Sequence, residues 1–281
     1  MSGTPPETNV GKLFKDELNK HGYSFQDAIA KAVTEIQSLS FWSPWVPELP
    51  VETQGDHTRI DFVLTNGRGT AYLVCECKRS NPALSNWCFA ETWFKSHNSL
   101  FHKAYAESLR DIGAGVLRSM VEELAPSDRL YQIAVEVKTA EKGDDNRKGR
   151  GQIEEAATQV CRQLNGLLNF FHGHTSLMAG RKKTAFVPII LTTAKLWTTE
   201  YDLSTASLDS GELDISELPV REAPWLWYQY HQSPGLKHGV PSGHTSTNIG
   251  DILFHEFVRP IAIVTPKGLS DFLRSNMWNI L

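Results

Sequence analysis

Three charged residues in this 281-residue chain, Asp61, Glu76 and Lys78, have types and positions that could do chemistry. Asp61 interrupts a run of apolar residues, and Glu76 and Lys78 lie at the end of another. A carboxylate or an ammonium group on a buried strand is costly unless it is paired or bound to an ion. Two carboxylates that converge are suited to a divalent cation, and a lysine beside them could act on developing negative charge.

The segments that carry these residues have the pattern of a β-hairpin. Thr58–Leu64 and Ala71–Lys78 are rich in β-forming residues, and the polar stretch between them contains Asn66-Gly67. Asn-Gly between apolar runs is a strong short-range hairpin signal.

The length of the hairpin loop decides whether the two carboxylates meet. Because side chains alternate between the faces of a strand, an even loop places Asp61 on the face of Glu76 and Lys78, and an odd loop places it on the other. A loop of about four residues, Asn66–Gly69, predicts that Asp61 lies opposite Val74 and diagonal to Glu76. Diagonal neighbours are roughly 7–8 Å apart at the backbone, near enough for both side chains to reach one cation.

Asp61 followed, after a hairpin, by Glu76-Cys77-Lys78 resembles the D…(D/E)-x-K core of the PD-(D/E)xK, or restriction-endonuclease-like, nucleases. Ile60 stands where the family motif has proline. The resemblance covers residues 23–80, and beyond them it is limited to the order of the elements. It implies that Asp61, Glu76 and the Cys77 backbone carbonyl bind Mg²⁺, with Mn²⁺ as a substitute. Lys78 would then orient the attacking water or stabilise the developing charge. A strand-end salt bridge between Asp61 and Lys78 is the alternative.

Members of this family often add an acidic residue from the first helix. The spacing of apolar residues predicts this helix over 25–36, with Ser24 as its N-cap. Gln26 stands where family members commonly have glutamate, and Gln26 and Glu35 are the additional catalytic candidates. Asp27 is explained as a capping residue, and a solvated helix residue is the alternative for Glu35.

A long amphipathic helix is predicted over Gln152–Phe171. It carries Gln152, Gln159 and Gln163, and some related nucleases place a glutamine of such a helix near the metal. A polar helix face is the alternative interpretation.

Glu136-Val137-Lys138 is a second E-x-K sequence, within a predicted strand over Leu130–Thr139. The nearest upstream acid, Asp128, is too close in sequence to lie on a separate preceding strand. We therefore interpret Glu136 and Lys138 as a charged strand end that could border the active cleft. The apolar face of this strand is predicted to comprise Tyr131, Ile133, Val135 and Val137.

Two basic segments are candidates for nucleic-acid contacts. One contains Arg147, Lys148 and Arg150 in a glycine-rich loop, and the other is Arg181-Lys182-Lys183. Lysine and arginine in such loops contact phosphates in nucleic-acid complexes, although charge runs are also often only solvated.

Composition narrows the possible classes of protein. The net charge of −4 and the pI of about 6.2 exclude a globally basic nucleic-acid binder but allow a local basic face. No apolar run approaches the roughly 20 residues that span a bilayer, and no signal-peptide pattern is present, so we expect a cytoplasmic protein without membrane association. Cysteines on a predicted core strand, Cys75 and Cys77, indicate buried reduced thiols rather than a disulfide framework.

The order of predicted elements indicates one α/β domain over residues 1–281, with a central mixed sheet and helices on both sides. We expect a loose terminus over 1–8, a helical insertion over 80–126 and a loop-rich C-terminal elaboration over 200–260. Further predicted elements are the strands Trp45–Thr53, Phe186–Ala194, Trp225–Tyr230 and Pro260–Val264 and the helices Val116–Leu124 and Leu269–Leu281.

These features predict a Mg²⁺-dependent nuclease that hydrolyses phosphodiester bonds, with DNA favoured over RNA. A setting in restriction, phage defence or repair rests on analogy alone. Two alternatives stay open: a catalytically silent module that binds nucleic acid or a partner protein, and a nuclease subunit that is active only in a complex. The sequence does not distinguish a monomer from a homo-oligomer.

Overall fold

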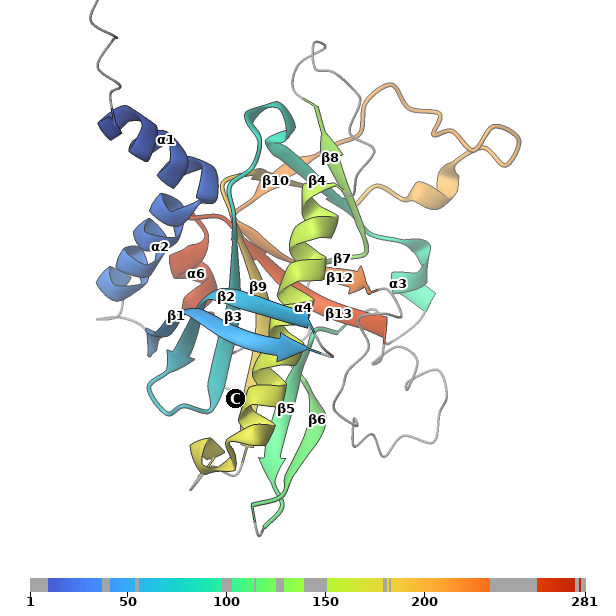
Figure 1. The fold of residues 1–281 in the computed structure, drawn as a ribbon. Helices are drawn as coiled ribbons and strands as arrows, with labels where there is room; N and C mark the ends of the chain where they lie inside the picture. Colours follow the sequence, from blue (N-terminus) through green and yellow to red (C-terminus); the bar gives the residue numbers. More distant parts are fainter. Residues whose placement is uncertain are drawn as a thin grey trace, which may run out of the picture.

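The computed structural model describes residues 10–36, 41–53, 56–97, 103–113, 115–124, 129–138, 151–178, 181, 183–232, 257–275 and 278. These residues form an α/β fold with a large mixed sheet flanked by helices (Figure 1), which confirms the predicted fold class at this level. None of the described helices is long and apolar enough to span a membrane.

The main sheet has nine strands: β1 (Trp42–Thr53), β2 (Asp56–Asn66), β3 (Ala71–Lys78), β5 (Tyr105–Asp111), β6 (Leu117–Glu123), β7 (Leu130–Tyr131), β9 (Lys183–Thr192), β12 (Trp225–His231) and β13 (Val258–Val264). A second sheet has four: β4 (Asn86–Ala90), β8 (Ile133–Val137), β10 (Lys195–Thr199) and β11 (Arg221–Ala223). The α-helices are α1 (Val10–His21), α2 (Tyr23–Ile36), α3 (Trp93–His97), α4 (Gln152–Gly173) and α6 (Leu269–Leu273). Short 3₁₀ turns cover Pro82–Leu84, Thr175–Met178 and Leu203–Thr205.

The strands of the main sheet follow the order β1-β2-β3-β9-β13-β12-β7, and the β5–β6 hairpin is attached through β9. β1, β2 and β3 form an antiparallel meander, whereas β9 is parallel to β3 and β13 is parallel to β9. The small sheet has the order β11-β10-β4-β8, so β8 is one of its edges.

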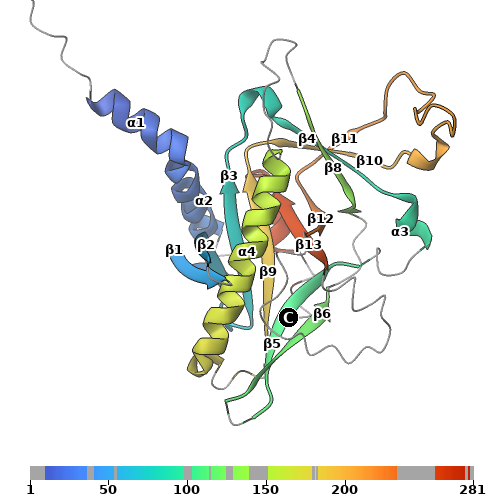
Figure 2. The ribbon, with the colours of Figure 1, turned by 45° about the vertical axis from the view of Figure 1, so that its right-hand side comes forward.

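Helices cover both faces of the main sheet. Helix α4 lies across β3 and β9 (Figure 2), while α2 and α6 lie on the other side of the sheet (Figure 1). Alternate residues of β3 divide between the two cores: Tyr72 and Val74 pack on the α4 side, and Leu73 and Cys75 pack with α2 and α6. Strand β9 is buried along nearly its whole length, as its continuous apolar sequence predicts.

The hairpin between β2 and β3 is present, but its register differs from the prediction. Val63, not Asp61, pairs with Val74, and the last pair before the turn is Thr65 with Tyr72. The loop is longer because Asn66 Oδ1 accepts hydrogen bonds from the backbone N–H groups of the two residues at the loop's far end, at 2.9 and 3.2 Å. The longer loop is still even, and Glu76 keeps its predicted side of β3, facing α4.

The predicted helical insertion over 80–126 is wrong. The described part of this segment contains β4, β5 and β6, and its one α-helix, α3, has five residues. Trp87 and Phe89 are buried at alternate positions of β4 rather than at helical spacing. The segment predicted as the helix Val116–Leu124 is the strand β6, paired with β5. Pairing with distant strands outweighs the local preference of such segments.

In the predicted loop-rich elaboration over 200–260, residues 200–220 contain one 3₁₀ turn and no strand, whereas β12 and the first residues of β13 belong to inner strands of the main sheet. The terminal helix ends at Leu273 rather than Leu281. The indole of Trp42 donates to the Leu273 carbonyl at 3.0 Å, which satisfies one of the helix's unpaired acceptors. The predicted loose terminus over 1–8 lies outside the described residues.

Two local predictions are also corrected. Helix α2 begins at Tyr23, so Ser24 is not its N-cap; the Ser24 hydroxyl donates to Asn19, and the chain turns at Gly22 with a φ of 79°. The predicted strand Leu130–Thr139 is divided between β7 and β8, in different sheets. On the edge strand β8, Val135 and Val137 are exposed, at 53% and 43%.

Candidate active site

The site is built at the open end of the β2–β3 hairpin. Asp61 is half-buried, and its Oδ2 accepts a hydrogen bond from the Cys77 backbone N–H at 2.6 Å. The strict alternation of β2 breaks here, because Ile60 and Val63, three residues apart, both belong to the α4-side core. Phe62 pairs with Cys75, and the same register places Asp61 level with Glu76 on the neighbouring strand.

Glu76 faces helix α4. The Gln163 side-chain amide donates to Glu76 Oε2 at 2.6 Å and to the Arg59 carbonyl at 2.9 Å. Gln163 is completely buried, and its Oε1 has no hydrogen-bond partner among the described residues. The glutamine therefore fixes one Glu76 oxygen and leaves a buried acceptor beside the carboxylates.

Burial sets the electrostatics of the pair. It raises the pKa of Glu76 to about 8, with a further contribution from the charge of Asp61. Burial likewise raises the pKa of Asp61 to about 6, against the opposing effect of the Cys77 amide. Two interacting carboxylates in a largely dry place form a site where a bound cation would favour the ionised form of both.

Lys78 joins the two carboxylates from the same strand face as Glu76. Its charge lowers the pKa of both Asp61 and Glu76, although burial has the larger effect on each. The Lys78 ammonium lies 3.0 Å from Glu155 Oε2, in the first turn of α4. The structure thus brings Asp61, Glu76 and Lys78 together, and the ion pair of Lys78 is with Glu155.

Of the two additional candidates on α2, only one reaches this site. The Gln26 amide donates to Glu48 Oε1, on β1, at 3.1 Å, and Gln26 also hydrogen-bonds Asp61, which lowers the pKa of that carboxyl while burial raises it. Glu35 was predicted wrongly, because its side chain is 68% exposed and is paired with Lys31 on the solvent side of the helix.

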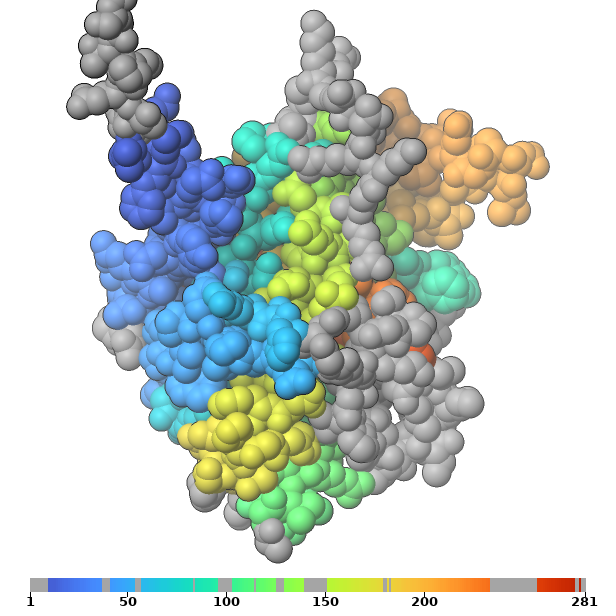
Figure 3. Space-filling view, in the orientation of Figure 1, coloured from blue at the N-terminus to red at the C-terminus, as the bar shows by residue number. Residues whose placement is uncertain are grey.

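The site lies between helices from opposite sides of the sheet. In the space-filling view, the end of β3 and the segment after it are visible between α1–α2 and α4 (Figure 3). Access from solvent is therefore to be expected along the seam between these two groups of helices.

Two of the basic residues predicted to contact nucleic acid, Arg181 and Lys183, lie among the described residues. Lys183 begins β9, at the opposite end of the sheet from Lys78, and its ammonium lies 3.3 Å from Glu122. Arg181 donates to the Tyr72 hydroxyl at 2.8 Å. Neither residue borders the carboxylates, so their predicted place beside the cleft is wrong, and their contact with nucleic acid stays a prediction. Arg147, Lys148, Arg150 and Lys182 lie outside the described residues.

The second E-x-K sequence has a different set of partners. Glu136 Oε1 accepts from the Ile153 backbone N–H at 2.8 Å, at the N-terminus of α4. The helix's own N-cap, Gly151, has no side chain, and a Cβ there would come within 2.6 Å of Glu136 Oε1. Glu136 therefore caps the helix.

The carboxylates of Asp61 and Glu76 suit Mg²⁺ better than a structural zinc ion. Within the described ranges, no group of three or more His, Cys, Asp or Glu side chains could hold a metal ion, whereas a structural zinc site needs four ligands. Mg²⁺ usually takes one or two carboxylates and completes its shell with water and substrate phosphate. The half-buried pair Asp61 and Glu76 fits this requirement.

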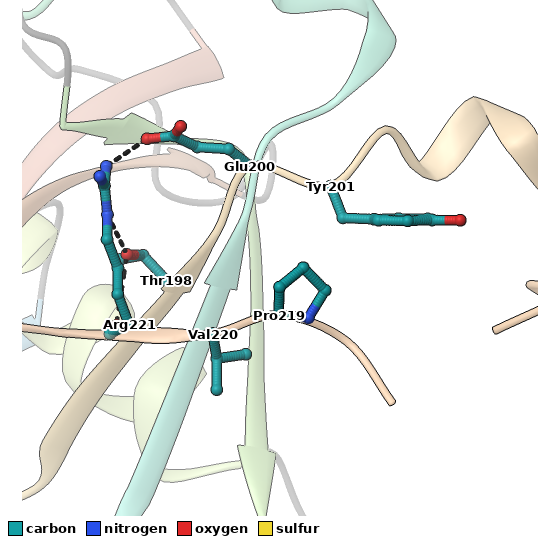
Figure 4. Close-up of a pocket in the computed structure, with 6 residues that line it drawn as sticks. All are labelled: Thr198, Glu200, Tyr201, Pro219, Val220 and Arg221. Carbon is teal, nitrogen blue, oxygen red and sulfur yellow. Dashed lines mark hydrogen bonds and ion pairs between the residues drawn. The ribbon is translucent and has the colours of Figure 1, made fainter. Parts of the chain in front are cut away.

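A separate hollow of about 440 Å³ lies away from the carboxylates (Figure 4). Arg221 crosses it, ion-paired with Glu200 and donating to Thr198 Oγ1 at 3.4 Å. Its remaining lining comes from Tyr201, Pro219 and Val220. The two charged residues that line the hollow, Arg221 and Glu200, are thus paired with each other. The lining contains one carboxylate, so it does not offer a second carboxylate pair.

The sequence left two interpretations open for Gln163, a glutamine near the metal and a polar helix face, and the structure places it, completely buried, against Glu76. Two other acidic neighbours of the pair were missed. Glu155 and Glu48 carry no sequence signal that separates them from other acidic residues.

Comparisons with protein-family models, with curated proteins and with solved structures gave no match.

Proposed function

We propose that this chain is a metal-dependent nuclease of the PD-(D/E)xK type. The observation that carries the proposal is the convergence of Asp61 and Glu76 across a hairpin, with Lys78 two residues further along the same strand. The order of elements supports it: helix α2, strands β1 to β3, helix α4 and then β9 beside β3. The restriction-endonuclease-like core is part of the proposal.

Asp61 and Glu76 would hold Mg²⁺ or Mn²⁺, with the Cys77 backbone carbonyl as a further ligand. When bound, such an ion supplies polarisation of the phosphoryl oxygen and neutralises charge on the leaving oxygen. The Cys77 amide and Gln163 keep the carboxylates in place before substrate arrives. Preorganisation of this kind lowers the cost of reaching the transition state.

Lys78 has a different role because a protonated ammonium cannot ligate a cation. Its charge is felt by both carboxylates. It would orient the attacking water and stabilise negative charge that develops on the phosphoryl group. Glu155 holds its ammonium at 3.0 Å in the absence of substrate.

The substrate and metal are tested together. Purified protein is incubated with supercoiled, linear and single-stranded DNA and with RNA, in Mg²⁺, Mn²⁺ or EDTA. We expect cleavage of DNA in either metal and none in EDTA. Cleavage that continues in EDTA would contradict the metal-dependent mechanism, and cleavage of RNA alone would move the substrate from DNA to RNA.

A cytoplasmic setting in restriction, phage defence or repair follows from the same proposal by analogy. If the chain binds Mg²⁺ but cleaves none of the nucleic acids, a subunit that needs a partner protein is favoured. If it binds nucleic acid without Mg²⁺ binding or cleavage, a silent binding module is favoured.

A further inference from the structure

We propose that Glu48, on β1, is a positioning residue for the carboxylate pair, because through Gln26 it holds Asp61 in place. This inference rests on the proposed nuclease function and deepens it.

The strand register places three acids in one row. Pro47 pairs with Phe62 and Leu49 pairs with Ile60, so Glu48 lies across from Asp61. On the other side of β2, the register of β3 continues to Glu76. Glu48, Asp61 and Glu76 therefore follow one another across three neighbouring strands, which are about 4.7–4.9 Å apart.

Such a row is unfavourable without compensation, because like charges directly opposite each other destabilise a sheet. A neutral residue at any of these three positions would reduce the repulsion between the carboxylates. No lysine or arginine among the described residues is ion-paired with Glu48. The arrangement thus favours a role that requires the acid.

Gln26 connects two members of this row. Its amide donates to Glu48 Oε1 at 3.1 Å, and it also hydrogen-bonds the Asp61 carboxylate. The glutamine side chain has one NH₂ group with two donors, enough for one bond to each carboxylate. Glu48 therefore orients the Gln26 amide, and the amide in turn orients Asp61.

The backbone of β1 is adapted to this contact. Glu48 has a φ of 48° and is the one non-glycine residue with positive φ in the described ranges. Strained backbone of this kind persists where the surrounding structure over-determines it. Glycine at this position would relieve the strain and remove the carboxylate in one step.

Glu52 offers a matched control. It lies on the same strand, is exposed, and pairs with His57 in regular register without a positive φ. Glycine there should weaken the strand and leave the site untouched. We therefore expect Glu48→Gly to raise the Tm and weaken Mg²⁺ binding. Glu52→Gly should lower the Tm and leave Mg²⁺ binding unchanged.

The test measures Mg²⁺ binding by calorimetry, with the ion alone as the probe, and thermal unfolding in EDTA. Glu48→Gly should weaken Mg²⁺ binding by about tenfold or more, the scale of a lost supporting group around a metal site, and raise the Tm in EDTA. Glu52→Gly should bind Mg²⁺ as the wild type does, with a lower Tm. Glu48→Gln keeps an acceptor for Gln26 and should retain affinity within about threefold, since it preserves the supporting hydrogen bond.

Several results would overturn the inference. Wild-type affinity in Glu48→Gly rejects it, and a loss in Glu48→Gln equal to that in Glu48→Gly rejects positioning in favour of direct ligation. If either of these results occurs while Glu76→Ala still abolishes Mg²⁺ binding, the inference about Glu48 fails and the proposed nuclease function is unaffected. If the wild type does not bind Mg²⁺, both proposals fail.

Discussion

The two E-x-K sequences of this chain share a pattern and a helix but differ in their surroundings. Glu76 and Glu136 each accept a hydrogen bond from a glutamine of α4: Gln163 at 2.6 Å and Gln152 at 3.5 Å, respectively. Each glutamate is also followed two residues later by a lysine, Lys78 or Lys138. The pattern alone therefore does not separate them.

Their neighbours do. Glu76 has Asp61 beside it, and burial together with this charge raises the pKa of Glu76 to about 8. Glu136 instead accepts the Ile153 backbone N–H, at the positive end of the α4 dipole. The Glu136 carboxylate thus caps a helix, whereas the Glu76 carboxylate lies beside a second carboxylate that repels it. An acid on the adjacent strand is what makes the first segment a candidate for metal chemistry.

The largest expected contrast is between the two lysines. Lys78→Met keeps the aliphatic stem but removes the charge, so it should retain Mg²⁺ and DNA binding while cleavage falls by roughly 10²-fold or more. Lys138→Met is the matched change in the other segment and should cleave DNA at the wild-type rate. Single-turnover cleavage with calorimetric metal titration measures both. Normal cleavage by Lys78→Met would remove the nuclease assignment from this hairpin and make the second segment the next candidate.

The two glutamines give a smaller contrast. Gln163→Leu removes the hydrogen bond that fixes Glu76 and should lower cleavage by about tenfold, within the range for residues that support metal ligands. Gln152→Leu removes a longer bond to Glu136 and the acceptor of the Asn81 backbone N–H, but neither touches Asp61 or Glu76, so cleavage should change by less than about twofold. Equal losses in the two variants, measured under single-turnover conditions, would mean that α4 acts on the site as a whole.

The smallest contrast is in stability: we expect Glu76→Gln to raise the Tm and Glu136→Gln to lower it. The folded pKa of Glu76 lies above its ordinary value of 4.5, at about 8, because of burial and then Asp61. The folded metal-free protein therefore retains a proton that the unfolded chain has lost, and its stability should decrease as the pH rises from about 5 to 8. Glu76→Gln removes this loss and should raise the Tm at pH 9 in EDTA.

Glu136→Gln should act in the other direction, because it weakens the cap of α4. The expected cost is about 1 kcal/mol, or roughly 2–4 °C in Tm for a chain of this size. Thermal unfolding of both variants in EDTA, from pH 5 to 9, provides the comparison. A lower Tm for Glu76→Gln than for the wild type at pH 9 would show that its carboxylate is not held in an unfavourable place.

Local signals in the sequence were sufficient for the hairpin and its charged end. Asn66-Gly67 marks the turn, and side-chain alternation predicts that Glu76 and Lys78 share a face of β3. The register error followed from the Asn66 side chain, which bonds the backbone at the far end of the loop and lengthens it by two residues relative to the prediction. Helix α4 and strand β9 were predicted from their periodicity for the same local reasons.

Long-range pairing accounts for what was not predicted. Trp87 and Phe89 are buried because β4 pairs with β10, more than 100 residues later in the chain. Val135 was expected inside, but β8 is an edge strand whose Glu136 points to the helix. Glu48 has no local signal, because its place beside Asp61 depends on the β1–β2 register and on a positive φ.

The most direct test of the central claim is single-turnover cleavage of one linear DNA by three proteins at the same Mg²⁺ concentration: the wild type, Glu76→Gln and Glu136→Gln. The account predicts that the wild type and Glu136→Gln cleave at similar rates below their unfolding temperatures. It predicts that cleavage by Glu76→Gln falls by at least about 10²-fold, because a carboxylate of the metal site is lost. Cleavage by Glu76→Gln at the wild-type rate would contradict the assignment of this site.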